Sequence, residues 1–210
     1  MKALKIVFFL STFFFFSFVG NEVFAQSTIQ PDSVCAGETV YYQLNGNSAS
    51  TYTWSILGAT GGSIVSGNTT DSIMVNWPNA GMDSIQVVET NEFGCSGEPY
   101  VLTVEILDLP TAIISGIDTV CYGEASSSLI EIVLTGTSDW EVVISDQTVN
   151  DTISVIASPY YYTTPNLFTP PSVSYTVVSV TDGNGCSNTG TGSATVVVSP
   201  ALLPLTIFHD

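Results

Sequence analysis

Basic side chains are almost absent from this chain of 210 residues. It contains only two Lys or Arg residues, Lys2 and Lys5, and both lie at the N-terminus. The region after residue 25 holds 18 of the 19 acidic residues and neither Lys nor Arg. A protein needs such cations to bind phosphate, nucleic acid or an anionic membrane by charge. The sequence therefore excludes these three functions, nucleic-acid binding included.

The residues that usually perform catalysis are also scarce. Ser-His-Asp and Cys-His chemistry requires a His within a site, and the only His is the penultimate residue, His209. The acidic residues are scattered over turns and strand starts rather than paired as in a glycosidase. No CxxC motif, Cys/His cluster or DxDxD loop is present. We expect a non-enzymatic protein without a cofactor, and calcium is the one ion that so acidic a surface suggests.

The N-terminus has the pattern of an export signal. Lys2 and Lys5 precede an apolar, Phe-rich segment at residues 6–19, and Val23-Phe24-Ala25 has the small-residue spacing of a signal-peptidase site. The apolar segment is shorter than the ~20 residues of a membrane-spanning helix. We therefore expect residues 1–25 to be a signal peptide cleaved after Ala25. The mature chain would then not span the membrane, and it would reside in the periplasm, at the outer membrane or on the cell surface.

The mature sequence repeats itself. Four short motifs occur twice in the same order: residues 34–38 and 120–124, Trp54 and Trp140, Asp71-Ser72-Ile73 and Asp151-Thr152-Ile153, and residues 91–96 and 182–187. This repetition predicts two modules, at residues 26–108 and 109–200, followed by an apolar tail at 201–210.

Each module is predicted to consist of short β-strands. Runs rich in Val, Ile, Thr and Tyr alternate with segments rich in Gly, Asn, Asp, Ser and Pro, and no sustained helical period appears. The expected strands are 40–44, 51–57, 72–77, 84–90 and 100–107, then 129–135, 140–145, 152–157, 174–181 and 194–199. So many short strands in each module indicate two tandem immunoglobulin-like β-sandwiches. Trp54 and Trp140 are expected in their cores.

A tyrosine-rich segment in the second module has no counterpart in the first. Residues 158–171 contain four prolines, which prevent the segment from joining a central strand, so we expect a loop. It either folds back over the sandwich edge or presents its aromatic side chains to a partner. The candidate contacts are Tyr160, Tyr161, Tyr162 and Phe168.

Each module contains two cysteines at matching positions. The repeat favours one disulfide in each module, Cys35–Cys95 and Cys121–Cys186. The first Cys of each pair precedes the second expected strand, and the second lies in the last hairpin. In an immunoglobulin-type sandwich those turns lie at opposite ends, so a Cys35–Cys186 bond remains the alternative.

The modules resemble the PKD-like, immunoglobulin-like domains of Bacteroidota surface proteins. The resemblance covers about residues 28–199 and is carried by the Val-Cys-x-Gly-Glu openings, residues 51–54, 73–77 and 88–95. The second module matches more loosely and has no counterpart of Trp77. The resemblance implies a β-sandwich fold and an association with gliding motility or type IX secretion. We expect no C-terminal sorting domain of the kind found in typical cargo, because residues 201–210 are too short for one.

A short motif, Asp-(Ser/Thr)-aliphatic, occurs five times. It is similar to the acceptor motif for protein O-glycosylation in Bacteroidota. The alternative is ordinary strand entry, in which Asp closes a turn and a hydroxyl residue begins a strand. The candidate acceptors are Ser33, Ser72, Ser84, Thr119 and Thr152.

The leading hypothesis is therefore an exported interaction or structural protein whose partners are envelope or surface proteins. The apolar tail is a further candidate contact, through Leu205, Ile207 and Phe208, because it either packs on the second module or offers a strand to a partner. The rival hypothesis is a carbohydrate-binding adhesin, in which the aromatic residues of 158–171 bind a glycan.

Overall fold

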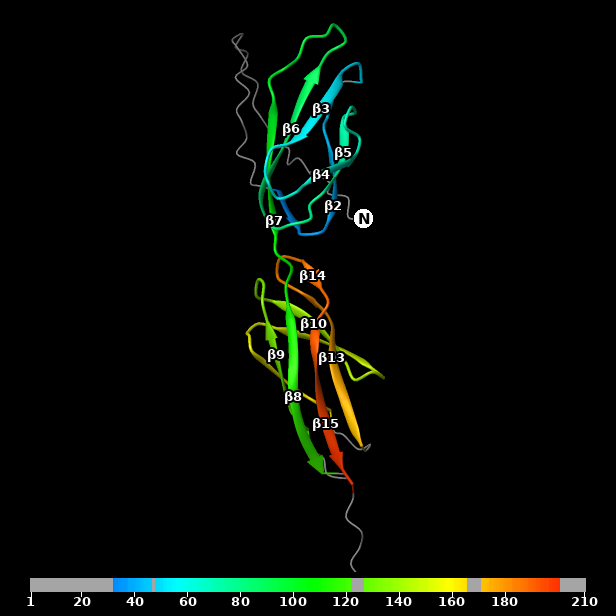
Figure 1. The fold of residues 1–210 in the computed structure, drawn as a ribbon, viewed down its shortest axis with the longest axis vertical. Coiled ribbons are helices and arrows are strands. Elements are labelled where there is room, and N and C mark those ends of the chain that lie inside the picture. Colours follow the sequence, from blue (N-terminus) through cyan, green and yellow to red (C-terminus); the bar gives the residue numbers. More distant parts are fainter. Residues whose placement is uncertain (1–31, 47, 122–126, 166–170, 201–210) are drawn as a thin grey trace, which may run out of the picture. The chain divides into compact units, whose positions relative to one another are not determined.

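The computed structural model describes residues 32–46, 48–121, 127–165 and 171–200, and within them it contains strands and no helix (Figure 1). The expected signal peptide and the C-terminal tail lie outside the described residues. The chain divides into two compact units, Met1–Leu107 (unit 1) and Asp108–Asp210 (unit 2).

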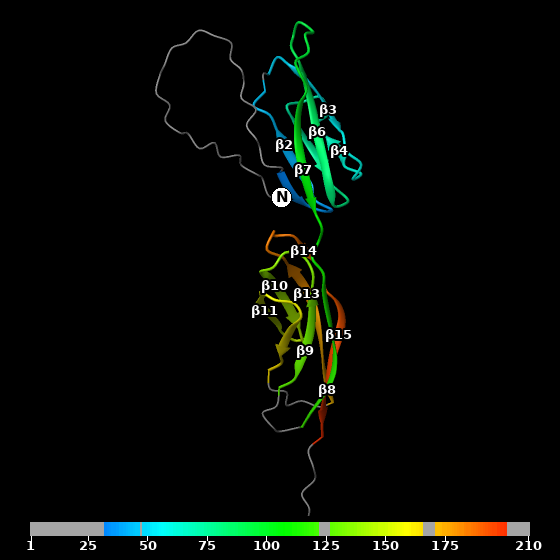
Figure 2. The same cartoon turned by 90° about the vertical axis from the view of Figure 1, so that its left-hand side faces the viewer.

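Unit 1 is built from two sheets of antiparallel and parallel strand pairs. One sheet has the order β1-β7-β6-β3 and the other β2-β5-β4, and β6 and β7 form the long hairpin visible in Figure 2. The strands are β1 (Asp32–Cys35), β2 (Thr39–Gln43), β3 (Thr51–Ile56), β4 (Ser63–Ser66), β5 (Ser72–Asn76), β6 (Gly81–Thr90) and β7 (Tyr100–Leu107).

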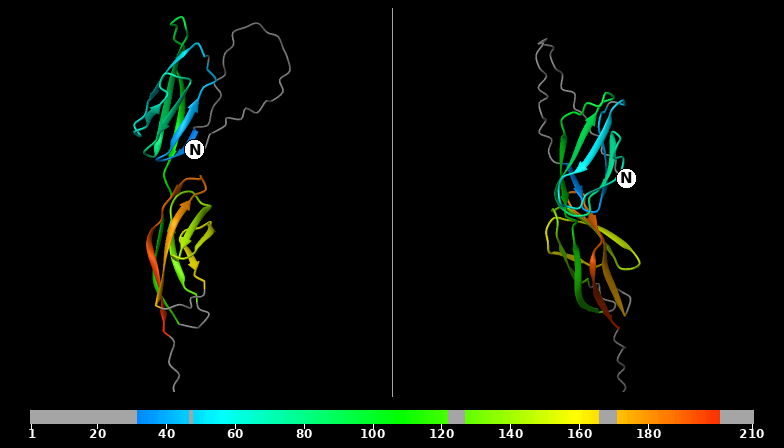
Figure 3. Two further views of the ribbon diagram at one scale, coloured as in Figure 1. Left: turned by 90° about the vertical axis from the view of Figure 1, so that its right-hand side faces the viewer. Right: turned by 45° about the horizontal axis from the view of Figure 1, so that its top comes forward.

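Unit 2 forms one continuous series of paired strands, β11-β10-β13-β15-β8-β9-β12, with β14 paired to β13. The parallel pair β8 and β15 runs along one side of this unit (Figure 3). β13 joins the two parts of this series, since Ser172–Tyr175 pair with β15 and residues 176–181 pair with β10. The strands are β8 (Ala112–Cys121), β9 (Leu129–Leu134), β10 (Trp140–Ser145), β11 (Asn150–Val155), β12 (Tyr160–Thr163), β13 (Ser172–Thr181), β14 (Ser187–Asn188) and β15 (Thr191–Ser199).

Each unit has its own apolar core, formed by the alternate side chains of its strands. The predicted burial of Trp54 on β3 and Trp140 on β10 is confirmed. Each indole N–H donates a hydrogen bond to a backbone carbonyl, of Thr70 at 2.8 Å and of Thr135 at 3.0 Å. Trp77 is fully buried in unit 1, and its indole donates to the Tyr42 hydroxyl at 3.1 Å. The indole rings thus fill the cores while their polar N–H groups remain satisfied.

Two sequence-based interpretations need correction. Tyr160–Thr163 were expected in a loop but form β12, which pairs with β9. Pro159 precedes this strand and Pro165 follows it, so no proline interrupts the ladder, and three consecutive Tyr residues suit a strand with one buried face.

The second correction concerns the repeat. Asp71-Ser72-Ile73 leads into β5, which pairs with β2 and β4, whereas Asp151-Thr152-Ile153 lies in β11, which pairs with β10. β5 pairs with β2 in unit 1, and β12 pairs with β9, the corresponding strand, in unit 2. The counterpart of β5 is therefore β12. The third motif match therefore joins strands that occupy different places in their units.

Candidate functional site

The tyrosines of β12 point alternately into and out of unit 2. Tyr162 is buried in the core, which contradicts its expected role as a partner contact, and Tyr160 packs partly against the same core. Tyr161 is 55% exposed and its hydroxyl donates to Glu131 on β9 at 3.2 Å. Phe168, Leu205, Ile207 and Phe208 lie outside the described residues. Of the predicted aromatic contacts that the structure describes, Tyr161 alone is freely available to a partner.

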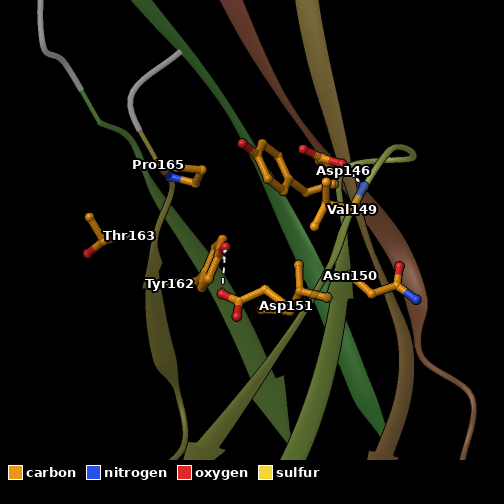
Figure 4. Close-up of a pocket in the computed structure, with 9 residues that line it drawn as sticks. Asp146, Val149, Asn150, Asp151, Tyr162, Thr163 and Pro165 are labelled. Carbon is orange, nitrogen blue, oxygen red and sulfur yellow. Dashed lines mark hydrogen bonds between the residues drawn. The ribbon is translucent and has the colours of Figure 1, made fainter.

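A pocket of about 390 Å³ opens beside β12, between the β10–β11 hairpin and β13. Figure 4 shows the Tyr162 side chain directed at Asp151, and its hydroxyl donates to that carboxylate at 3.1 Å. Asp146, at the hairpin turn, accepts hydrogen bonds from Val149 and from both the backbone and the hydroxyl of Thr148, all at 2.7–2.8 Å. The Thr148 hydroxyl bond, followed by the backbone bonds, lowers the pKa of Asp146. The Asp146 carboxylate in this pocket is therefore ionised at neutral pH.

Tyr175 on β13 also lines this pocket. Its hydroxyl is buried and has no hydrogen-bond partner of acceptable geometry among the described residues. Burial, together with the charge of Asp146, raises the pKa of Tyr175, and the nearby Thr164 hydroxyl opposes part of the shift. Tyr162 and Tyr175 lie with ring centroids 6.1 Å apart and tilted planes. Both rings are buried in the core of unit 2, so neither offers an exposed aromatic face on which a ligand could stack.

Unit 2 exposes a broad apolar surface that the sequence did not identify. We call it the outer face; it is formed by the outward side chains of the neighbouring strands β12, β9, β8 and β15. The register places Ile113 opposite Val133 and Tyr161 opposite Glu131, so these side chains share one side of the sheet. Ile117 is 86% exposed and Leu129 is 65% exposed. The large exposed apolar side chains of this face are Ile113, Ile117, Leu129, Val133, Tyr161 and Val197.

The predicted intramodule disulfides are wrong. Cys35 and Cys186 are disulfide-bonded, whereas Cys95 and Cys121 are free and exposed. Cys35 pairs with Leu107 at the end of β7, and Cys95 precedes the start of β7 at Tyr100. The length of β7, ~23 Å at 3.3 Å per residue, separates the two positions, and a disulfide requires Cα atoms closer than ~7 Å. The alternative Cys35–Cys186 bond agrees with these assignments.

Asp83 shows why one of the Asp-Ser motifs is present. Its side chain is 3% exposed and accepts hydrogen bonds from Gly58 N and Ser84 N, both at 2.7 Å, from Thr60 N at 3.3 Å and from the Thr60 hydroxyl. A Cβ at position 58 would lie 2.3 Å from Asp83 Oδ1, so only glycine permits this approach. Burial opposes ionisation, but the bonds from Thr60, Ser84 and Gly58 together outweigh it and lower the pKa of Asp83. Asp83 thus fixes the loop after β3.

The candidate glycosylation acceptors differ in access. Ser33, Thr119 and Thr152 are exposed, whereas Ser72 and Ser84 are half-buried. Asp118 repeats part of the Asp83 arrangement, since Thr119 N donates to its carboxylate at 2.7 Å and the Ser128 hydroxyl donates at 2.6 Å. In two of its five copies, those of Asp83 and Asp118, the Asp of the motif thus accepts hydrogen bonds from nearby backbone and hydroxyl groups.

Within the described ranges, no group of three or more His, Cys, Asp or Glu side chains lies close enough together to hold a metal ion. The same part of the chain contains no helix that could cross a bilayer. His209 lies outside it.

Residues 22–104 match a family model described as a PKD-like domain. Among solved structures, the fibronectin(III)-like modules of Clostridium thermocellum CbhA share 14% identity and a TM-score of 0.41, over 88% of this chain and 98% of theirs. A fragment of three titin immunoglobulin domains shares 12% identity and a TM-score of 0.47, over 80% of this chain and 62% of the fragment. Bacteroides ovatus SGBP-B, solved with a mixed-linkage heptasaccharide, shares 17% identity and a TM-score of 0.26, over 80% of this chain and 43% of that one. A comparison with curated proteins gave no match.

The described residues thus form an all-β structure, and residues 22–104 match a PKD-like family model. Function on such folds depends on individual surfaces and not on the fold.

Proposed function

We propose that the mature chain is an exported, non-enzymatic interaction protein of the cell envelope or surface, built from two tandem PKD-like modules and associated with gliding motility or type IX secretion. The Lys-flanked leader, the disulfide-bonded state of Cys35 and Cys186 and the PKD-like match at residues 22–104 support export and this fold. The gliding and secretion roles rest on the resemblance to Bacteroidota surface proteins.

The observation that carries an interaction role is the outer face of unit 2. Large exposed apolar side chains stand on four neighbouring strands, and large apolar patches on a protein surface mark interaction sites. Glu131 lies within the face, and no Lys or Arg follows residue 25. A matching partner is therefore a protein with apolar side chains at the centre of its surface and Lys or Arg at the rim.

Site-specific photo-cross-linking tests this assignment. A photoreactive residue at position 117 should cross-link one basic envelope protein in the native cell, whereas the same residue at position 156, also exposed but outside the outer face, should not. The captured protein, once purified, should bind the wild-type chain more weakly as salt rises and should not bind Ile117→Asp. Equal capture at 117 and 156, or undiminished binding by Ile117→Asp, would overturn the proposal.

The C-terminal tail remains a second proposed contact for the same partner. Deletion of residues 202–210 should leave the melting of both units unchanged and weaken binding. If the deletion destabilises unit 2 and leaves binding intact, the tail packs on that unit.

The pocket beside β12 favours carbohydrate binding as a second candidate function. Its Asp146 and Asp151 carboxylates and the Asn150 amide are groups that hydrogen-bond sugar hydroxyls. A glycan array followed by calorimetry should then detect an oligosaccharide whose affinity falls with Asn150→Ala and is unchanged with Asn91→Ala in unit 1. An array without hits, or equal affinity for both variants, would exclude this role.

A further inference from the structure

The two units place one cysteine at the same strand end. Cys35 is the last residue of β1 and pairs in parallel with Leu107, the last residue of β7. Cys121 is the last residue of β8 and pairs in parallel with Ser199, the last residue of β15. We call these two residues the strand-end cysteines. Their equivalence follows from strand register as well as from the repeated Val-Cys-x-Gly-Glu motif.

The two units also repeat a cysteine-bearing turn. Asn91 N donates to Cys95 O at 3.0 Å, and Asp182 N donates to Cys186 O at 2.9 Å. Cys95 N donates to the Asn91 side chain at 2.9 Å, and Cys186 N donates to the Asp182 side chain at 3.1 Å. We call Cys95 and Cys186 the turn cysteines.

The backbone conformation of the turn in unit 1 also matches that of the turn in unit 2. Gly94 and Gly185, which precede the turn cysteines, have φ values of 82° and 83°. The hydroxyl pair Thr90–Ser96 in unit 1, at 3.0 Å, recurs as Thr181–Ser187 in unit 2, at 2.8 Å. The turns thus hold their cysteines in the same local conformation.

The bonding states of these four residues are unequal. One strand-end cysteine (Cys35) and one turn cysteine (Cys186) are disulfide-bonded, and the other member of each type is free and exposed. A disulfide thus already occurs in this protein between the two types of position that Cys121 and Cys95 repeat. Free, exposed thiols are also unusual in a protein that carries a disulfide, and they indicate pairing between molecules.

We propose that Cys95 of one copy of this chain forms a disulfide with Cys121 of another, which joins copies head to tail. The inference does not depend on the outer face or on the pocket. Because the contact is heterologous, each copy keeps one free cysteine of the opposite type, and a third copy can be added. The product is a linear series of modules linked by the same type of bond throughout.

The chemistry requires an external disulfide as oxidant. The Cys95 thiolate attacks the oxidant, forms a mixed disulfide and releases one thiolate. The Cys121 thiolate of the second copy then attacks the Cys95 sulfur and releases the other. Two protein thiols lose two electrons and two protons in total, and the oxidant is reduced to two thiols.

Oxidation of the purified mature chain with oxidised glutathione tests the proposal. On non-reducing gels the wild type should form a ladder of dimer, trimer and longer species that collapses with dithiothreitol. Cys95→Ser and Cys121→Ser should each remain monomeric, because neither can supply both types of cysteine. An equimolar mixture of the two variants should give a dimer and nothing longer, since only one compatible pair then exists.

Peptide mapping of the ladder identifies the bond. Chymotrypsin and Glu-C are required, because trypsin has no site after residue 25. The mapping should give a Cys95–Cys121 peptide in the oligomers and a Cys35–Cys186 peptide throughout. A wild type that stays monomeric would overturn the proposal, and so would a Cys95–Cys121 bond within the monomer. Dimers of Cys121→Ser would show Cys95–Cys95 pairing and refute the head-to-tail arrangement.

Discussion

The buried carboxylate of Asp83 offers the sharpest test of how unit 1 is held together. In Asp83→Asn, one side-chain oxygen still accepts from Gly58 N and Ser84 N, but the amide NH₂ now faces Thr60 N. One unpaired backbone N–H costs about 1–3 kcal/mol. The two remaining bonds lose their ionic character and roughly half of their strength. We expect the free energy of unfolding of unit 1 to fall by about 3 kcal/mol.

Thermal and urea unfolding measure this loss. Tryptophan emission in a Trp140→Phe background reports unit 1 alone, through Trp54 and Trp77. For a domain of this size, 3 kcal/mol corresponds to a decrease in melting temperature of about 12–24 °C. Glu92→Gln, which removes the same charge from an exposed turn, is the matched control and should change stability by less than about 0.5 kcal/mol.

The effect of pH distinguishes the ionised carboxylate from simple packing. The pKa of Asp83 is lowered in the folded state, so its stabilising contribution is fully present above the unfolded value of about 3.9. The contribution is lost as the pH falls from there through the lowered pKa. The difference between wild type and Asp83→Asn should therefore be constant from pH 5 to 7 and shrink below about pH 4. A variant as stable as Glu92→Gln at pH 7, or a difference that persists unchanged at pH 2.5, would refute the reasoning.

Three further predictions concern other features. Trp54→Ala should destabilise unit 1 by ~3–5 kcal/mol because it empties a core position, and an unchanged urea midpoint would contradict the packing. A thiol reagent should titrate two cysteines in the native monomer, two after unfolding without reductant, and four after reduction. A monomer with no reactive thiol would instead support the two intramodule disulfides. Mass spectrometry of the native protein should find O-glycans at the exposed Thr119 or Thr152 and not at the half-buried Ser84, and a glycan at Ser84 alone would contradict this order.

Strand positions were predictable wherever a run of β-branched and aromatic residues was long enough. β7 and β10 have the expected bounds, and most other expected strands differ by one to three residues at their ends. β1 and β8 were not among the expected strands, and neither were β4 and β14, which are short and rich in Ser and therefore show no apolar alternation. β12 was missed because the flanking prolines outweighed three consecutive tyrosines, although an edge strand tolerates prolines beside it.

The candidate sites were less predictable, because they depend on which strands become neighbours. The repeat predicts the disulfides correctly only if the two cysteines of each module lie close together. Cys35 pairs with Leu107, at the end of β7 that lies away from Cys95, so the two cysteines of the first module are too far apart to bond. The outer face combines residues from β8, β9, β12 and β15, which are separated by up to 84 positions in the sequence. No local pattern identifies Ile117 as exposed. Alternation of apolar and polar residues shows that a strand has two faces, but it does not show which face the rest of the protein covers.

The carboxylates of Asp83, Asp146 and Asp182 accept hydrogen bonds from backbone N–H groups, and the described residues contain no Lys or Arg that could pair with them. Among the described residues every charged side chain is a carboxylate, so each interaction between two of them is repulsive. Dissolved salt can only relieve that repulsion, so moderate ionic strength should make the fold and any self-association stronger, where it would weaken a protein held by ion pairs. A protein of this kind should be more stable in a saline medium, and its stability should fall on transfer to very dilute water.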